Sequence, residues 1–160
     1  MYDKILLPLD GSEFAERVIP RIEPLAEKLG SALVLLQVTT ALETLIAQTT
    51  PGMAGSPGAF VDPQPIMAAE QAAAAEYLGA LAERLRAKGF TVEAEHPEGH
   101  AATTIIERAR AHGADLIAMT THGRSGLGRL VFGSVAEEVL RHATCPVLLV
   151  RMTNDKARAK

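Results

Sequence analysis

Five short strand-like runs alternate with longer amphipathic stretches along this 160-residue chain. Four of the runs, at residues 4–9, 31–38, 116–119 and 146–151, are apolar, as buried parallel strands are. The fifth run, 91–96, alternates apolar and charged residues, which is typical of a half-exposed edge strand. The stretches between the runs predict helices at 12–29, 66–88, 103–112 and 135–142. This alternation predicts an α/β fold, a doubly wound five-stranded parallel sheet with helices on both faces.

Capping and breaking residues mark the first predicted helix. Ser12 is suited to the N-cap, and Gly30 is suited to end the helix after residue 29. Pro20 and Pro24 lie inside the same stretch, and they predict a kink or break near its middle.

The segment 39–65 interrupts the regular alternation. Its central part, 51–58, is rich in proline and glycine, and we expect a long flexible loop there. Such a loop is either a lid or binding loop, or an insertion that the surface tolerates. The chain is therefore predicted to form one domain over 1–152, which contains this loop, followed by a basic tail at 153–160.

Composition favours an ordinary globular protein, with 48% hydrophobic and 22% charged residues. The net charge of −3 gives no electrostatic reason to expect nucleic acid as a partner. No apolar stretch reaches the roughly 20 residues that span a bilayer, and the N-terminus does not resemble a signal peptide, so a cytoplasmic location without a membrane partner is expected. Cys145, the single cysteine, is predicted to be a small buried apolar residue, and the five histidines form no metal-spaced pair on a helix.

A glycine-rich stretch follows the run at 116–119. It contains Gly123, Gly126 and Gly128, and Gly133 and Ser134 then precede the last predicted helix. Glycines let backbone N–H groups approach an anion closely, and a helix start adds unpaired N–H groups and a positive dipole end. With Ser134 as the N-cap, the pattern predicts a phosphate-binding cradle. It matches neither a Walker A loop nor a G-x-G-x-x-G dinucleotide motif.

These residues resemble the universal stress protein family, whose signature G-x2-G-x9-G-[ST] contacts nucleotide phosphates and ribose. Gly123, nine further residues, and then Gly133 and Ser134 match its last two elements. The resemblance extends to residues 4–12 and 143–150 and thus spans nearly the whole chain. The first glycine of the signature is Thr120 here, and its Cβ could crowd the ribose while its hydroxyl could add a hydrogen bond. We expect weakened nucleotide binding rather than none.

The resemblance implies a Rossmann-like fold, related to adenine nucleotide alpha hydrolases, with strand order 3-2-1-4-5. In this order the winding direction changes between strands one and four, and ligands bind outside the carboxyl ends of strands at such a point. The nucleotide-binding residues implied or predicted in this way are Pro8, Leu9, Asp10, Val38, Met119, Thr120, Thr121, His122, Gly123, Arg124, Ser125, Gly126, Gly133, Ser134, Val135 and Ala136.

Asp10 has two interpretations. Directly after the first strand, its carboxylate could accept hydrogen bonds from ribose hydroxyls or hold a cation, or it could cap the first helix together with Ser12. Val38 ends the second predicted strand, and the resemblance implies that it lies beside the adenine ring. No catalytic residue is identified.

The resemblance thus implies an ATP-binding universal stress protein, a nucleotide-dependent stress-response or regulatory module, with Mg²⁺ or Mn²⁺ bridging the phosphates. It also implies a homodimer through the final strand, 147–150, whose apolar edge would otherwise be exposed. Two alternatives stay open: a homodimeric interaction module of the same fold without nucleotide, and an enzyme acting on an adenylated small molecule. At most slow ATP hydrolysis is expected, because no water-positioning base is identified.

Overall fold

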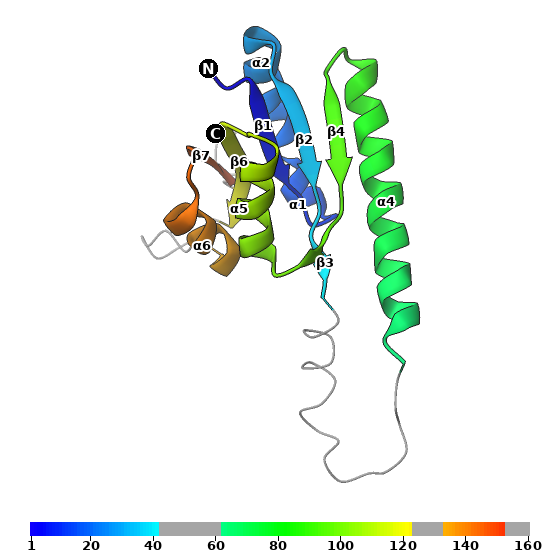
Figure 1. The fold of residues 1–160 in the computed structure, drawn as a ribbon. Helices are drawn as coiled ribbons and strands as arrows, with labels where there is room; N and C mark the ends of the chain where they lie inside the picture. Colours follow the sequence, from blue (N-terminus) through cyan, green and yellow to red (C-terminus); the bar gives the residue numbers. More distant parts are fainter. Residues whose placement is uncertain (42–61, 123–132, 153–160) are drawn as a thin grey trace, which may run out of the picture.

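The computed structural model describes residues 1–41, 62–122 and 133–152, without the side chains of His122 and Met152 (Figure 1). Its strands and helices, in chain order, are β1 (Lys4–Pro8), α1 (Glu13–Glu16), α2 (Ile19–Leu29), β2 (Ala32–Leu36), β3 (Thr39–Thr40), α4 (Gln64–Ala87), β4 (Val92–Glu95), β5 (Glu98–Gly99), α5 (Ala101–Ala111), β6 (Leu116–His122), α6 (Ser134–His142) and β7 (Val147–Met152).

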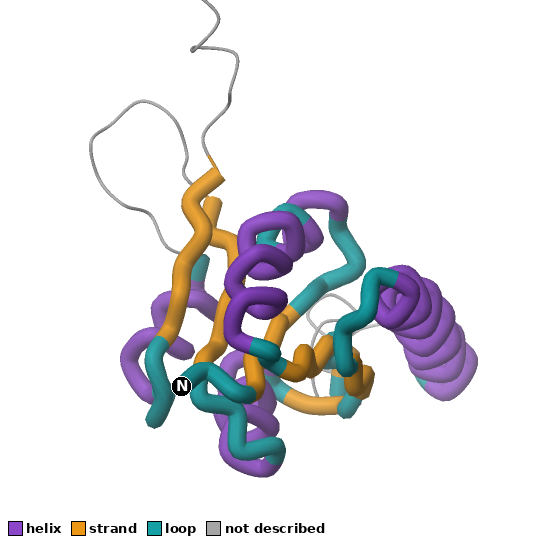
Figure 2. The backbone as a smooth tube through the Cα atoms, turned by 90° about the horizontal axis from the view of Figure 1, so that it is seen from above, coloured by secondary structure: helices purple, strands orange, loops and turns teal. Residues whose placement is uncertain are grey.

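The main sheet has five strands in the order β4-β2-β1-β6-β7, and every neighbouring pair is parallel. Numbered along the chain without the two short strands β3 and β5, this order is 3-2-1-4-5, which confirms the expected topology. Helices lie on both sides of the strands (Figure 2), so the sheet is the middle layer of three. None of the helices in the described ranges is long and apolar enough to cross a membrane.

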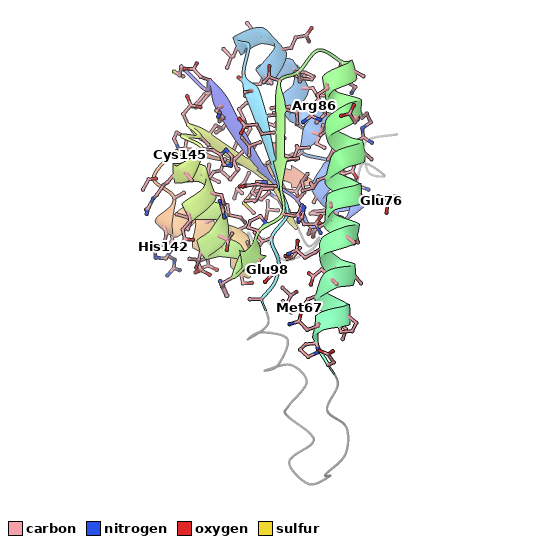
Figure 3. The ribbon with its side chains drawn as sticks, turned by 45° about the vertical axis from the view of Figure 1, so that its right-hand side comes forward. Met67, Glu76, Arg86, Glu98, His142 and Cys145 are labelled. Carbon is pink, nitrogen blue, oxygen red and sulfur yellow. The ribbon has the colours of Figure 1, made fainter. Side chains whose placement is uncertain are left out.

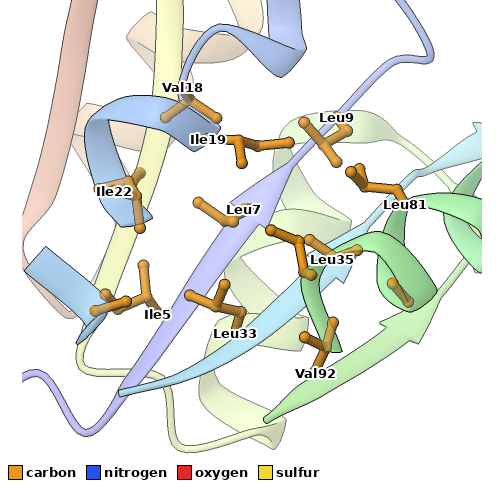
Figure 4. Packing of buried hydrophobic residues seen from close by; sticks show 14 of the residues in the cluster. Ile5, Leu7, Leu9, Val18, Ile19, Ile22, Leu33, Leu35, Leu81 and Val92 are labelled. Atoms are coloured by element: carbon orange, nitrogen blue, oxygen red, sulfur yellow. The ribbon is translucent and has the colours of Figure 1, made fainter. Parts of the chain in front are cut away.

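Alternate residues of the strands form two separate cores. On one face, Ile5, Leu7 and Leu35 are fully buried against α2 and α4 (Figure 4). On the other face, Leu6 and Ile117 pack under α5 and α6. Because successive side chains point to opposite faces, only a sheet covered on both sides gives such apolar runs.

The first predicted helix is divided in two. The Ser12 hydroxyl accepts a hydrogen bond from the Ala15 N–H at 3.1 Å, which confirms it as the N-cap of α1. Pro20 lies in the first turn of α2, where its missing N–H leaves no hydrogen bond unmade. The predicted break thus falls between Glu16 and Ile19, and Gly30 ends α2 with a left-handed φ of +70°.

A second, two-stranded sheet was not predicted. β3 pairs in parallel with β5, at Thr39 with Glu98 and Thr40 with Gly99. The Glu70 carboxylate on α4 accepts hydrogen bonds from the N–H and hydroxyl of Thr40, at 3.0 and 3.1 Å. Met67 lies on the part of α4 that extends beyond the main sheet (Figure 3). These bonds therefore tie the extended part of α4 to the short sheet.

The amino ends of the strands are joined by internal hydrogen bonds. The Asp115 carboxylate accepts bonds from the N–H groups of Asp3 and Lys4, at 2.9 and 3.1 Å. The Ser31 hydroxyl donates to the carbonyl of Tyr2. Desolvation alone would raise the pKa of Asp115, but the backbone N–H donors outweigh it and hold that pKa below its usual value.

Candidate functional site

β1 and β6 separate toward their carboxyl ends. They pair only at Ile5 with Leu116 and at Leu6 with Ile117. β6 and β7, in contrast, stay paired from Ile117 through His122. The separation lies at the point where the winding direction of the sheet changes, where open α/β sheets bind their ligands.

A pocket of about 290 Å³ opens at this separation. Its walls are mostly apolar, and Asp10 is the charged residue among its described lining residues. The lining residues are Pro8, Leu9, Asp10, Phe14, Ala15, Leu36, Val38, Ala101, Ile105, Met119, Thr120, Thr121, Gly133, Ser134, Val135 and Ala136.

Asp10 supports the cap of α1 through Ser12, and its role toward a ligand stays a prediction. Its Oδ1 accepts hydrogen bonds from the N–H and the hydroxyl of Ser12, at 3.0 and 2.6 Å, and this fixes the loop before α1. Its side chain is nevertheless exposed and lines the pocket. No donor in the described part of the chain bonds to Oδ2, which leaves this oxygen for a ligand.

Two helices begin at the pocket without a side-chain cap. Gly133, and not Ser134 as predicted, is the N-cap of α6, because its extended backbone (φ −63°, ψ 153°) turns its carbonyl toward the N–H of Glu137, at 2.9 Å. Ser134 is instead the first helical residue. α5 begins after His100, whose side chain does not cap it either. Both helix starts therefore offer backbone N–H groups and a positive dipole end.

The pocket gathers most of the predicted site residues. Every predicted residue whose side chain the structure describes lies in its lining, from Pro8 to Ala136 along the chain. The side chain of His122, and all of Gly123, Arg124, Ser125 and Gly126, lie outside the described residues.

Five lining residues were missed by the sequence analysis: Phe14, Ala15, Leu36, Ala101 and Ile105. Leu36 could have been found, because it is the last residue of β2 and strand ends meet at this edge. Phe14 and Ile105 could not, because each lies on a helix face whose tilt over the sheet is set by tertiary packing.

Cys145 is outside the pocket. It is half-buried and packs against the α5–α6 core, so the residue that was predicted to be buried is only partly covered. Desolvation raises the pKa of this thiol above its usual value. In the described ranges, no three histidine, cysteine or carboxylate side chains gather in a way that could hold a metal ion.

Comparisons with known proteins agree with this architecture. The family model described as "Universal stress protein family" matches residues 1–151. Universal stress protein YxiE of Bacillus subtilis is 29% identical over 151 residues, which cover 94% of this chain and all of that protein. The solved structure of MJ0577, a universal stress protein of Methanocaldococcus jannaschii, superposes with a TM-score of 0.76 at 26% identity, covering 96% of this chain and 99% of the other. A universal stress protein in complex with cAMP shares the fold, with a TM-score of 0.62 at 21% identity, and the match covers 95% of this chain and 98% of that one.

Proposed function

Because this chain belongs to the universal stress protein family, we propose that it is a stress-response module that binds ATP in the pocket between β1 and β6. The observation that carries the proposal is the chemistry of that pocket. Apolar walls, one carboxylate and two helix starts without side-chain caps meet at the carboxyl ends of the strands. A nucleotide presents the matching groups, which are a flat base, sugar hydroxyls and phosphates.

Each part of the nucleotide has candidate partners. Val38 and Met119 supply apolar surface for adenine, and Oδ2 of Asp10 can accept a hydrogen bond from a ribose hydroxyl. The start of α6, at Gly133 and Ser134, lines the same pocket and would face the phosphates. The glycine-rich residues from Gly123 to Gly126 are predicted to add further phosphate contacts. The related universal stress protein that was solved with cAMP supports an adenine nucleotide as the ligand class.

A divalent cation fits this arrangement. Mg²⁺ is usually held by one or two carboxylates together with substrate phosphates and water. Asp10 offers one such carboxylate oxygen, Oδ2, so Mg²⁺ or Mn²⁺ would take most of its ligands from the phosphates. When bound, the ion would neutralise phosphate charge. We assign no catalytic residue, and we retain the cytoplasmic location as a prediction.

The proposal is tested by calorimetry with ATP and magnesium, and by chromatography of nucleotide released from freshly purified protein. ATP at about one hundred times its dissociation constant should add roughly 2.7 kcal/mol to the free energy of unfolding. Absence of binding heat, of released nucleotide and of any rise in melting temperature would favour the alternative, an interaction module without nucleotide.

We also propose that two copies associate through β7, over Val147–Val150. β7 is the last strand of the sheet order, and Leu148 on it is 39% exposed. Leu140, one of the apolar positions of the last predicted helix, is 40% exposed as well. Pairing of two β7 edges would cover apolar surface and unpaired backbone groups. Light scattering at micromolar concentration should give twice the chain mass of 17.0 kDa, and Leu148→Lys should give the single chain.

A further inference from the structure

The side-chain amide of Gln71 joins three segments of the chain at the short sheet. Gln71 lies on α4, and its Nε2 donates hydrogen bonds to Oγ1 of Thr39 at 2.6 Å and to Oε1 of Glu98 at 3.2 Å. Its Oε1 lies 2.5 Å from Nδ1 of His96. Thr39 belongs to β3 and Glu98 to β5, whereas His96 directly follows β4. One residue of α4 therefore holds both strands of the short sheet and the chain that leaves β4.

The chemistry of the partners fixes the direction of each bond. An ionised carboxylate only accepts hydrogen bonds, so Glu98 must face Nε2 of Gln71 and not its Oε1. Oε1 then faces His96, whose Nδ1 must carry the proton. The Thr39 hydroxyl accepts from Gln71 and donates onward to the carbonyl of Pro97, at 3.4 Å. A carboxylate in place of the amide would therefore lose both donated bonds and would lie against a second carboxylate.

The short sheet lies in both connections that lead to walls of the pocket. Val38, which lines the pocket, directly precedes β3. Ala101, which also lines it, follows β5 after one intervening residue. β3 and β5 pair over two residues each, and so short a pair of strands is at best marginally stable by itself. The placement of these two walls is therefore expected to depend on the bonds from α4.

We propose that Gln71 is a positioning residue for ligand binding, which sets the spacing between Val38 and Ala101 by holding β3 against β5. Gln71 does not line the pocket, so it acts through the short sheet. Glu70, its neighbour on α4, bonds to Thr40 of β3 and, within the described ranges, to no residue of β5. This inference rests on the proposed nucleotide binding and adds a residue outside the pocket that determines the pocket's shape.

The consequence is a loss of affinity that ATP and adenosine share. Val38 is the residue proposed to lie beside adenine, and both ligands carry this base. A change in the spacing of the walls should therefore weaken both ligands by a similar factor. The loss of a phosphate contact would instead weaken ATP alone.

The test compares Gln71→Glu, which keeps the shape of the side chain, with Gln71→Glu combined with Glu98→Gln, which exchanges the two groups. Gln71→Glu should bind ATP and adenosine about tenfold more weakly in calorimetry, because two carboxylates repel each other across the short sheet. The double variant again sets a donor against a carboxylate and should bind both ligands within about threefold of the wild type. Glu98→Gln alone keeps an acceptor for Gln71 and should stay in the same range. Gln64→Glu, the same substitution at the exposed first residue of α4, is the matched control.

Urea denaturation of the ligand-free variants separates positioning from folding. If Gln71→Glu does not fold, Gln71→Met removes the donors without adding charge and should weaken both ligands about threefold. A folded variant at this position that binds both ligands like the wild type would overturn the inference. A double variant that is as stable as the wild type but binds no better than Gln71→Glu would overturn it too, as would a loss confined to ATP. If the wild type binds neither ATP nor adenosine, the proposed function itself fails and this inference falls with it.

Discussion

The amino and carboxyl ends of the central sheet differ in how far their polar groups are hydrogen-bonded within the protein. At the amino end, Asp115 accepts hydrogen bonds from two backbone N–H groups, and Ser31 donates to a carbonyl. At the carboxyl end, α5 and α6 begin without side-chain caps, and Oδ2 of Asp10 accepts no hydrogen bond from the described residues. We infer from this difference that the polar groups at the amino end stabilise the fold, whereas those at the carboxyl end are available to the proposed ligand.

This contrast can be tested by substitution. Changes at the amino end should lower the free energy of unfolding and leave ligand affinity unchanged. Changes at the carboxyl end should mainly affect affinity, unless they displace a helix start.

The largest effect is expected from Gly99→Ala, at the carboxyl side of the molecule. A Cβ at this position would lie 2.3 Å from Oγ1 of Thr104, so the Thr104 side chain must rotate or the start of α5 must shift, and the φ of +156° strains any other residue there. We expect a loss of about 3 kcal/mol in the free energy of unfolding, from overpacking, together with weaker ATP binding. Urea denaturation and calorimetry measure the two effects. Gly79→Ala, in an open position on α4, is the matched control and should be neutral or stabilising.

Asp115→Ala tests the amino end. It leaves the N–H groups of Asp3 and Lys4 without their charged acceptor, and should lower the free energy of unfolding by about 2 kcal/mol, given that the site is half-exposed. ATP affinity, measured by calorimetry, should be that of the wild type. A clear loss of affinity would break the proposed division between the two ends.

Thr120→Gly tests the one departure from the family signature at the carboxyl end. Thr120 lines the pocket with a branched side chain, and its removal gives a ligand room to approach the backbone. We expect ATP affinity to rise about tenfold, or about 1.4 kcal/mol. The free protein should lose some stability, roughly 0.5–1 kcal/mol, because glycine weakens a strand. Weaker ATP binding in this variant would mean that the threonine hydroxyl contacts the ligand.

The smallest effect is a pH dependence at the amino end. The folded-state pKa of Asp115 is lowered, so its stabilising contribution is present above the unfolded-state pKa and is lost as pH falls through the folded-state pKa. Denaturation measured between neutral and acidic pH should show this loss. In Asp115→Asn the part of this loss that comes from protonation of Asp115 should disappear. If the free energy of unfolding of this variant depends on pH as in the wild type, Asp115 is not the group responsible.

Features with a repeated local pattern were predictable from the sequence. The five main strands, the Ser12 cap and the break before Pro20 each depend on residues close together in the chain. Asp10 and Thr120 each follow or end a strand next to the point where the winding direction changes, so the sequence also predicted that they meet at one pocket.

What was missed depends on contacts between distant residues. β3 and β5 are two residues long, too short to show a period, and they pair Thr39 with Glu98. The choice of Gly133 over Ser134 as the N-cap depends on a backbone angle that either residue could adopt. Ile105 reaches the pocket because of the way α5 packs over β6 and beside α6, which no local pattern encodes.

The break at Arg17 and Val18 lets one short stretch of sequence serve two independent purposes. Before the break, Phe14 borders the pocket, and after it Ile22 is anchored in the interior. A substitution at Phe14 would therefore change the wall of the pocket while the packing of Ile22 in the core stays the same.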